Sequence, residues 1–335
     1  MIHIADDLGI ASDRPVGRRI SRRALFAATA AAASQTLIGG RGNAAPAPAP
    51  KRLCPGAFEV LSVPSTMGAV PVQVQWARRG GDRAVYLLDG LRAFSTASGW
   101  AIAGAHRLFA DDDITVVMPV GGQSSFYADW TAPSTLNGQR HAYRWETFLA
   151  AELPEFLADY GVSPTGCAVA GLSMGASAAV ALAAAHPAQF AHASAFSGAM
   201  NWELPGIREA LRIAALQGGG YDLTALAPAG SLAWRRLDPT AVAPQLRDIG
   251  LYVSAATGIP GNYDSGASID EIAITAGASI IEAVSCVTTR AFQDRLEALG
   301  IAATFDYPPV GTHRWQYWVS ALAAARPHVL SAIGA

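Results

Sequence analysis

The feature of this sequence that most constrains its fold is the pentapeptide Gly171-Leu172-Ser173-Met174-Gly175, which stands between a short apolar run and an alanine-rich stretch. This G-x-S-x-G pattern is typical of a sharp turn between a buried strand and a helix. Its glycines let the strand and the helix cross closely, and the strained turn presents the serine hydroxyl at the carboxyl edge of a sheet. We therefore expect Ser173 to be a nucleophile, with the N–H of Met174 directed at the same point.

Short apolar runs bounded by turn residues predict further strands on both sides of this motif. Such runs fit the strands of a parallel sheet that is buried on both faces. Because strands alternate with helical segments, we expect one α/β-hydrolase domain with a mostly parallel central sheet over residues 58–335. The predicted strands are 58–63, 70–77, 84–88, 114–119, the run that ends at the motif, 193–197, 251–256 and 303–307. Helices are predicted within 143–160, directly after the motif, and over 267–299 and 315–333, with shorter ones in 204–237.

The first 57 residues differ in composition from the rest of the chain. Arg22-Arg23 precede an apolar run at 24–38, and small residues follow at 44–45, which together predict an export signal over residues 1–45. The arginine pair resembles a twin-arginine signal. A membrane anchor is the alternative, which the shortness of the run disfavours. Residues 46–57 are expected to be a Pro/Ala-rich linker, so the protein is predicted to be secreted or to reside in the cell envelope.

Composition limits the class of partner. The formal net charge of −2 gives no reason to expect nucleic acid. An odd number of cysteines, three, argues against a disulfide scaffold in an exported chain. The sequence has no zinc-protease, P-loop or C-x-x-C motif, so we expect neither a metal nor a cofactor.

The histidine partner of Ser173 can be predicted from chain order. An α/β-hydrolase presents its acid and then its histidine after the serine. His313 lies in the loop after the last predicted strand, whereas His328 lies deep in the final predicted helix. We therefore expect His313 to be the base.

The acid and the second oxyanion donor are less constrained by spacing. Pattern alone slightly favours Asp264, the first acid after the predicted strand at 251–256. A second backbone donor is expected from the loop 89–92, after an earlier strand. The candidate acids are Asp264, Asp270, Glu271, Glu282, Asp294, Glu297 and Asp306.

Five longer motifs follow one another along the chain. They are YLLDGLRA at 86–93, VVMPVGGQSSFYADW at 116–130, WETFLAAELP at 145–154, GLSMG at 171–175 and PPVGTHRWQYW at 308–318. Together these motifs resemble the antigen 85 family of mycolyltransferases, which are secreted serine esterases of mycolate-containing bacteria. The resemblance runs in order from about residue 58 to the C-terminus.

This resemblance implies a Ser-Glu-His triad. The family's glutamate precedes a Phe-Gln-Asp segment by ten residues, which implies that Glu282 is the acid and replaces the pattern-based preference for Asp264. The resemblance also implies Leu91 as the second oxyanion donor. The substrate-binding residues are expected to be Asp89 and Arg92 on the sugar side, Trp315 beside the base, and in addition Asn201 and Arg314.

The implied activity is transfer of a mycoloyl group between trehalose monomycolate molecules or onto cell-wall arabinan, without a cofactor. The chain departs from the family at the acceptor rim, with Phe94-Ser95-Thr96 in place of Gln-Asp-Asp and Asn201 in place of an aspartate. It also lacks the family's cysteines at 131–143 and 254–256. Because of these departures, the sequence does not determine which sugar accepts the acyl group.

Two other functions remain open at this point. One is a secreted carboxylesterase that passes the acyl group to water, and the other is a non-catalytic extracellular binding protein. A separate hypothesis concerns Cys286, which follows Glu282 by four residues and would share its face of a helix. A thiol adduct there would disturb the acid, whereas the alternative is a packed core cysteine. Oligomeric state is not predicted.

Overall fold

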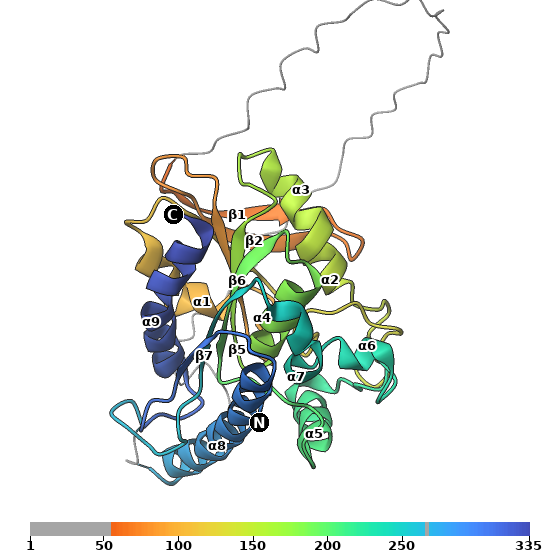
Figure 1. Ribbon diagram of the computed structural model, residues 1–335. Coiled ribbons are helices and arrows are strands. Elements are labelled where there is room, and N and C mark those ends of the chain that lie inside the picture. Colours follow the sequence, from red (N-terminus) through yellow and green to blue (C-terminus); the bar gives the residue numbers. More distant parts are fainter. Residues whose placement is uncertain (1–54, 265–267) are drawn as a thin grey trace, which may run out of the picture. The chain divides into compact units, whose positions relative to one another are not determined.

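A computed structural model describes residues 55–264 and 268–335 (Figure 1). Its sheet has eight strands in the order β1-β2-β4-β3-β5-β6-β7-β8, and β3 to β8 pair in parallel. The α/β-hydrolase fold with a mostly parallel sheet is therefore confirmed. The strands are β1 Phe58–Val63, β2 Val70–Gln75, β3 Ala84–Leu88, β4 Thr115–Pro119, β5 Cys167–Leu172, β6 Phe190–Phe196, β7 Gly250–Ser254 and β8 Thr304–Asp306. The predicted export signal, and the linker up to residue 54, lie outside the described residues.

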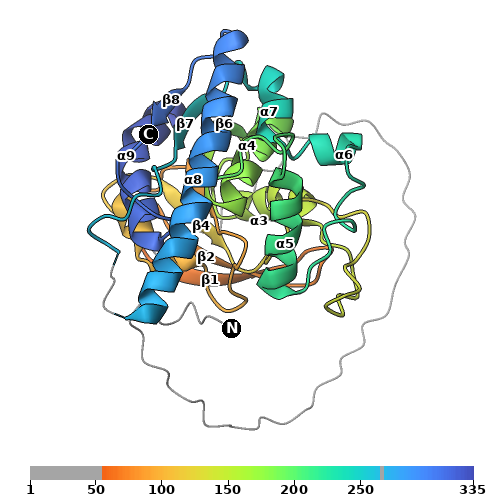
Figure 2. The same ribbon diagram turned by 90° about the horizontal axis from the view of Figure 1, so that it is seen from below.

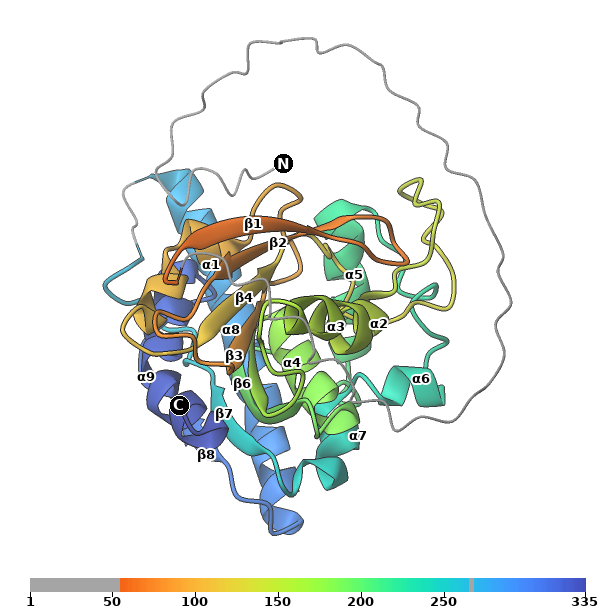
Figure 3. The ribbon, with the colours of Figure 1, turned by 90° about the horizontal axis from the view of Figure 1, so that it is seen from above.

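Helices cover both faces of this sheet. Viewed from above, α1 and α9 lie on one side of the strands and α2, α3 and α4 on the other (Figure 3). The helices are α1 Gly99–Ile102, α2 Trp145–Thr147, α3 Leu153–Ala158, α4 Met174–Ala185, α5 Ile207–Gly219, α6 Leu232–Arg235, α7 Pro239–Val242, α8 Ile269–Ala298 and α9 Trp315–Ile333. Short 3-10 turns occupy Ala105–Phe109 and Ala243–Leu246, and a π-helical turn at Phe148–Glu152 joins α2 to α3.

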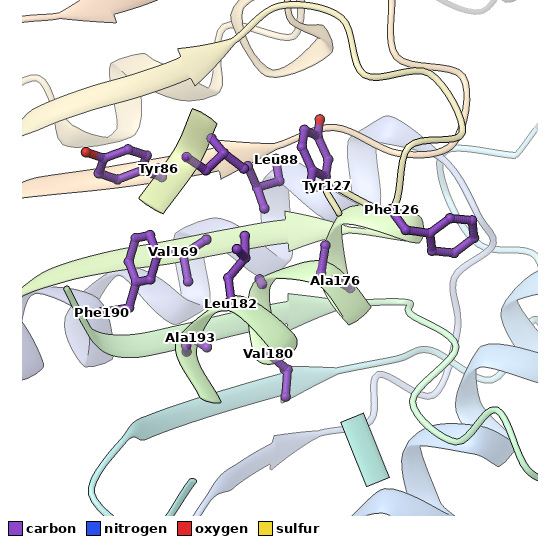
Figure 4. Close-up of a cluster of buried hydrophobic side chains, with 14 of the residues drawn as sticks. Tyr86, Leu88, Phe126, Tyr127, Val169, Ala176, Val180, Leu182, Phe190 and Ala193 are labelled. Atoms are coloured by element: carbon purple, nitrogen blue, oxygen red, sulfur yellow. The ribbon is translucent and has the colours of Figure 1, made fainter. Parts of the chain in front are cut away.

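The central strands are buried on both faces because their side chains alternate between two apolar cores. Tyr86 and Val169 point into the core beneath α4, whereas Val85 and Ala168 belong to the core beneath α9. Figure 4 shows the first core, in which Leu182 of α4 lies among side chains of the central strands. This arrangement explains why these strands read as continuous apolar runs rather than alternating ones.

The segment 204–237 differs from its expected form. Instead of short helices throughout, it holds the 13-residue helix α5, which buries only Ala215 fully. Gly218 and Gly219 are the last two residues of α5. Gly220 then ends the helix at φ 72°, a left-handed conformation that suits a residue without a Cβ.

Candidate active site

Ser173 occupies the sharp turn between β5 and α4, as the pentapeptide predicts. Its φ of 53° and ψ of −117° lie outside the regions that L-residues prefer, so the turn is strained. A Cβ on Gly171 would overlap the carbonyl of Gly175, and a Cβ on Gly175 would overlap the carbonyls of Leu88 and Asp89. Both glycines are therefore required for the strand and helix to cross at this distance.

A hydrogen-bonded relay connects Ser173 to a histidine and a glutamate. His313 Nε2 lies 2.9 Å from Ser173 Oγ, and His313 Nδ1 lies 3.0 Å from Glu282 Oε2. The His313 ring packs edge-on against Trp318 of α9, with ring centroids 4.8 Å apart. The fold thus brings together three residues that lie 109 and 31 positions apart in the sequence, in the arrangement of a serine-hydrolase triad.

Glu282 is held on both carboxylate oxygens. It projects from α8 and is buried, with 1% of its surface exposed. Its Oε1 accepts hydrogen bonds from Ser197 Oγ and from the N–H of Ala256, both at 2.8 Å, while Oε2 faces His313. The carboxylate therefore has little freedom to rotate away from the imidazole.

Ser197 is a member of this network that sequence reasoning missed. It follows β6 at φ 53°, another strained non-glycine position, and its Oγ also accepts a hydrogen bond from Trp318 Nε1 at 3.1 Å. Ser285 of α8 donates from its Oγ to the Ser197 carbonyl at 3.0 Å. No spacing rule marks a serine at this place, because its role arises only when β6, α8 and α9 meet.

Asp264, the acid that pattern alone favoured, does not contact His313. Its carboxylate accepts hydrogen bonds from Thr312 Oγ1 and Tyr317 OH, each at 2.6 Å, and pairs with Arg314 Nε at 3.1 Å. Burial alone would raise the pKa of Asp264, but these hydrogen bonds and the arginine lower it overall. Asp264 therefore anchors the loop that carries His313.

The loop after β3 lies beside Ser173, where a second oxyanion donor is needed. A Cβ on Gly90 would stand 2.7 Å from Leu172 Cδ1 and 3.5 Å from Ser173 Cβ. The next residue, Leu91, accepts a hydrogen bond from the Ser124 N–H at 2.9 Å. Met174 is the first residue of α4, so its N–H has no partner within the helix. The loop and the helix start thus flank the serine.

Asp89 is enclosed rather than open to solvent. It is 1% exposed, its Oδ2 accepts from the Gly99 N–H at 3.0 Å, and its Oδ1 accepts from Ser98 Oγ at 3.2 Å. Burial raises the pKa of Asp89 to about 7, although the hydrogen bonds from Gly99 and Ser98 oppose this. The carboxyl fastens the loop after β3 to the start of α1.

The other predicted substrate residues differ in their surroundings. Arg92 is exposed, and Trp315 is partly buried with its ring edge-on to Trp100 at 5.5 Å. Asn201 is half-buried, and its Oδ1 accepts a hydrogen bond from the Glu203 N–H. The side chain of Arg314 is 10% exposed. It pairs with Asp264 and donates to Thr275 of α8 at 2.9 Å, so its guanidinium ties the His313 loop to α8.

Cys286 lies on α8, one turn after Glu282, and is 8% exposed. Both cysteines in the described part of the chain, Cys167 and Cys286, are free and buried. Among the described residues, no group of three or more metal-ligating side chains is placed to hold an ion.

The sequence of this chain is similar to that of known proteins. The model of the family described as "Putative esterase" matches residues 64–329. The diacylglycerol acyltransferase/mycolyltransferase Ag85B of Mycobacterium intracellulare is 39% identical over 326 residues, covering 95% of this chain and 96% of the relative. The corresponding Ag85C of Mycobacterium leprae is 38% identical over 277 residues, covering 81% and 80%.

Solved structures are also similar to this chain. MPT51 (FbpC1) of Mycobacterium tuberculosis superposes with a TM-score of 0.69 at 31% identity, covering 83% of this chain and 99% of that one. The Staphylococcus aureus serine hydrolase FphF superposes with a TM-score of 0.60 at 16% identity, covering 83% of this chain and 99% of FphF. The likeness to FphF concerns the fold alone.

Proposed function

This chain belongs to the antigen 85 family of mycolyltransferases, and on that premise we propose that it transfers a mycoloyl group from trehalose monomycolate to a sugar hydroxyl through an acyl-enzyme on Ser173. The observation that carries the proposal is the relay from Ser173 through His313 to Glu282, with its two contacts of 2.9 and 3.0 Å. The acceptor is a second trehalose monomycolate or the cell-envelope arabinan.

In the first half-reaction, His313 Nε2 takes the proton from Ser173 Oγ as the oxygen attacks the ester carbonyl. The negative charge that develops on the carbonyl oxygen is stabilised by the N–H groups of Leu91 and Met174. When the tetrahedral intermediate collapses, the C–O bond to the sugar breaks, and His313 gives its proton to the leaving trehalose oxygen. The acyl group remains as an ester on Ser173.

In the second half-reaction, a sugar hydroxyl takes the place of the departed trehalose. His313 accepts its proton as the hydroxyl oxygen attacks the acyl-enzyme, and Ser173 Oγ leaves with that proton. Glu282 keeps Nδ1 of the imidazole directed away from the serine and stabilises the imidazolium in both halves. Its bonds to Ser197 and Ala256 support this role, because they hold the carboxylate before substrate arrives.

The names of the relatives support a lipid acyl group, because they are called diacylglycerol acyltransferases and mycolyltransferases. Trehalose mycolates and related lipid–sugar esters are the proposed substrates, and the proposed location is outside the cell or in its envelope. Asp89, Arg92 and Trp315 are the proposed sugar-side residues. Asn201 stands where the family has an aspartate, which changes this rim. The preferred acceptor therefore has to be measured.

The test is transfer from purified trehalose monomycolate by the wild-type protein and by Ser173→Ala. We expect trehalose dimycolate from the wild type and a loss of at least about 10³-fold in the variant. Unchanged turnover by Ser173→Ala would contradict the assignment. Release of free acid alone, at any trehalose concentration, would instead identify a carboxylesterase. Tight ligand binding that survives loss of Ser173, with no turnover by the intact protein, would identify a binding protein.

A further inference from the structure

Helix α8 carries an exposed apolar face that the fold does not use. It is the one described helix that is long and apolar enough to cross a membrane by length and composition, yet only 28% of its most apolar 18-residue window is buried. Helix α4 is also apolar, but eleven of its twelve residues are buried beneath the sheet. The apolar residues of α8 are therefore not explained by the core.

These exposed side chains form a stripe along one side of α8. We call this set the α8 stripe; it consists of Ile269, Ile272, Ile280, Ile281, Val284 and Val287, which are 40 to 85% exposed. The spacing from 269 to 287 follows the helical period over about five turns, or roughly 27 Å. In Figure 2, which views the domain from below, α8 lies in front of the sheet with no other labelled element crossing it.

The stripe lies on the outer side of the helix that carries the catalytic acid. Between residues 272 and 289, the only charged residue of α8 is Glu282, which is buried against His313. The neighbouring loops extend the apolar surface toward the base, because Ile259 is 57% and Val310 is 44% exposed. These two loops are joined by the bond from the Gly311 N–H to the Ile259 carbonyl at 2.7 Å. The loop of Ile259 in turn lies against α8, since a Cβ on Gly258 would stand 2.5 Å from the Ser279 carbonyl.

The charge around the stripe indicates which surface it would meet. The ends of α8 carry both signs, with Asp270 and Glu271 at the start and Arg290, Asp294, Arg295 and Glu297 at the end. The only lysine in the whole sequence is Lys51. Helices that bind anionic bilayers combine an apolar face with many lysines and arginines. The α8 stripe lacks that cationic border, so it suits a lipid surface whose headgroups carry no net charge.

A second copy of this chain fits the stripe less well. Helices that cross at about −50°, the commonest packing class in globular proteins, touch mainly near their crossing point, whereas the stripe extends over about five turns. The loop residues Ile259 and Val310 would lie outside such a contact. A lipid surface, in contrast, meets the whole length of a helix that lies in its plane.

We propose that the α8 stripe docks the enzyme on a lipid surface with uncharged headgroups, such as an assembly of glycolipids, with the catalytic side facing the lipid. This inference rests on the proposed function in one respect, namely that the acyl donor is a lipid held in such an assembly. Docking would place the outer face of α8 in the interface while its inner face keeps Glu282 against His313. The acyl ester would then reach Ser173 without crossing bulk water.

The experiment is flotation of the full chain with vesicles of phosphatidylcholine. We expect the wild type to float and the double variant Ile280→Gln, Val287→Gln to lose at least fivefold in bound fraction. Leu232→Gln is the matched control, since Leu232 is 76% exposed on α6 and lies outside the stripe. Addition of phosphatidylglycerol should not increase binding. Circular dichroism of each variant establishes that the fold is intact.

Three results would overturn the proposal. The first is equal flotation of the wild type and the double variant, and the second is binding that depends on phosphatidylglycerol. The third is a dimer in analytical ultracentrifugation that the double variant abolishes, which would make the stripe an interface between two copies. Ser173→Ala separates this inference from the proposed function, because it should float like the wild type. Absence of acyl transfer with flotation intact would count against the function alone, and turnover of a soluble short-chain ester without flotation would count against docking alone.

Discussion

On the acid–base side of Ser173, two side chains and one backbone N–H from three separate loops hold one buried carboxylate. On the acceptor side, one predicted residue is exposed to solvent and another is bonded within the protein. Glu282 accepts from Ser197 and Ala256 and faces His313. Across the serine, Arg92 is exposed and Asp89 is enclosed within its own loop. The difference suggests that the acyl chemistry is fixed by the fold, while acceptor choice depends on a small number of surface groups.

The largest effect is expected from a substitution of the catalytic acid itself. Glu282→Gln keeps the shape of the side chain but removes the charge that stabilises an imidazolium, so kcat should fall on the order of 10³-fold or more with little change in KM. Steady-state kinetics on a short-chain ester measures this. Glu297→Gln is the control, because Glu297 lies on the same helix, is exposed, and accepts a side-chain hydrogen bond from Gln293 and not from the triad. A loss of tenfold or less in Glu282→Gln would mean that another group acts as the acid.

The second effect concerns stability on the acceptor side. The pKa of Asp89 in the folded protein is raised to about 7 from 3.8. A raised folded pKa means that its contribution to stability is present at low pH and is lost as pH rises through about 7. At about 1.4 kcal/mol per pH unit, the free energy of unfolding should fall by at most roughly 2 to 3 kcal/mol between pH 5 and pH 8.

Asp89→Asn tests this, because the amide cannot ionise and keeps an oxygen for the Gly99 N–H. Urea unfolding of both proteins at pH 5 and pH 8 gives the measurement. The free energy of unfolding of the variant should increase relative to that of the wild type as pH rises. Subtracting one free energy from the other removes the contributions of other groups, such as Asp238, whose pKa burial also raises. An equal pH dependence in the two proteins would show that Asp89 stays ionised, which would fit a direct role in sugar binding.

The third effect is smaller and asks how rigid the acid–base side must be. Ser197→Ala removes one of the donors to Glu282, so kcat should fall about tenfold, in the range of one hydrogen bond to a charged group. The pH–rate profile should also shift, since the acid then holds His313 less firmly. A role in folding alone would leave that profile unmoved.

The strained backbone at Ser197 calls for a second variant. Ser197→Gly removes the same hydroxyl but relieves the positive φ, so equal losses in the two variants would assign the effect to the hydroxyl. Ser194→Ala, on the preceding strand β6, is the control, because Ser194 is buried and bonds His192 rather than Glu282. If Ser197→Gly is clearly more active than Ser197→Ala, the loss in Ser197→Ala arises from the strained backbone instead.

Some residues of the site could be predicted from the sequence, and others could not. The positions of Ser173 and Met174 follow from a local motif, and that of His313 follows from chain order. Chain order did not distinguish Glu282 from the other candidate acids, because it comes from the middle of α8 and meets His313 only through tertiary packing. Only the family resemblance implied it. Asp264 satisfied the order rule, yet the structure uses it to bind Thr312, Tyr317 and Arg314. Most elements could be predicted from the pattern of apolar residues. Helix α5 could not, since Ala215 is its only fully buried residue.

The smallest expected effect tests the acceptor side where it is most open. Arg92 is exposed in the loop beside Ser173, and its proposed contact with a sugar would be a solvated hydrogen bond of modest strength. Arg92→Ala should therefore raise the KM for the sugar acceptor about three- to fivefold, while leaving the rate of acyl-enzyme formation within twofold. Trehalose titration against a fixed acyl donor separates these two quantities, and Arg235→Ala, on α6, is a control for loss of an arginine outside the site. If acyl-enzyme formation slows instead, the loop after β3 shapes the oxyanion site through Leu91, and the two sides of Ser173 are less independent than their hydrogen bonds suggest.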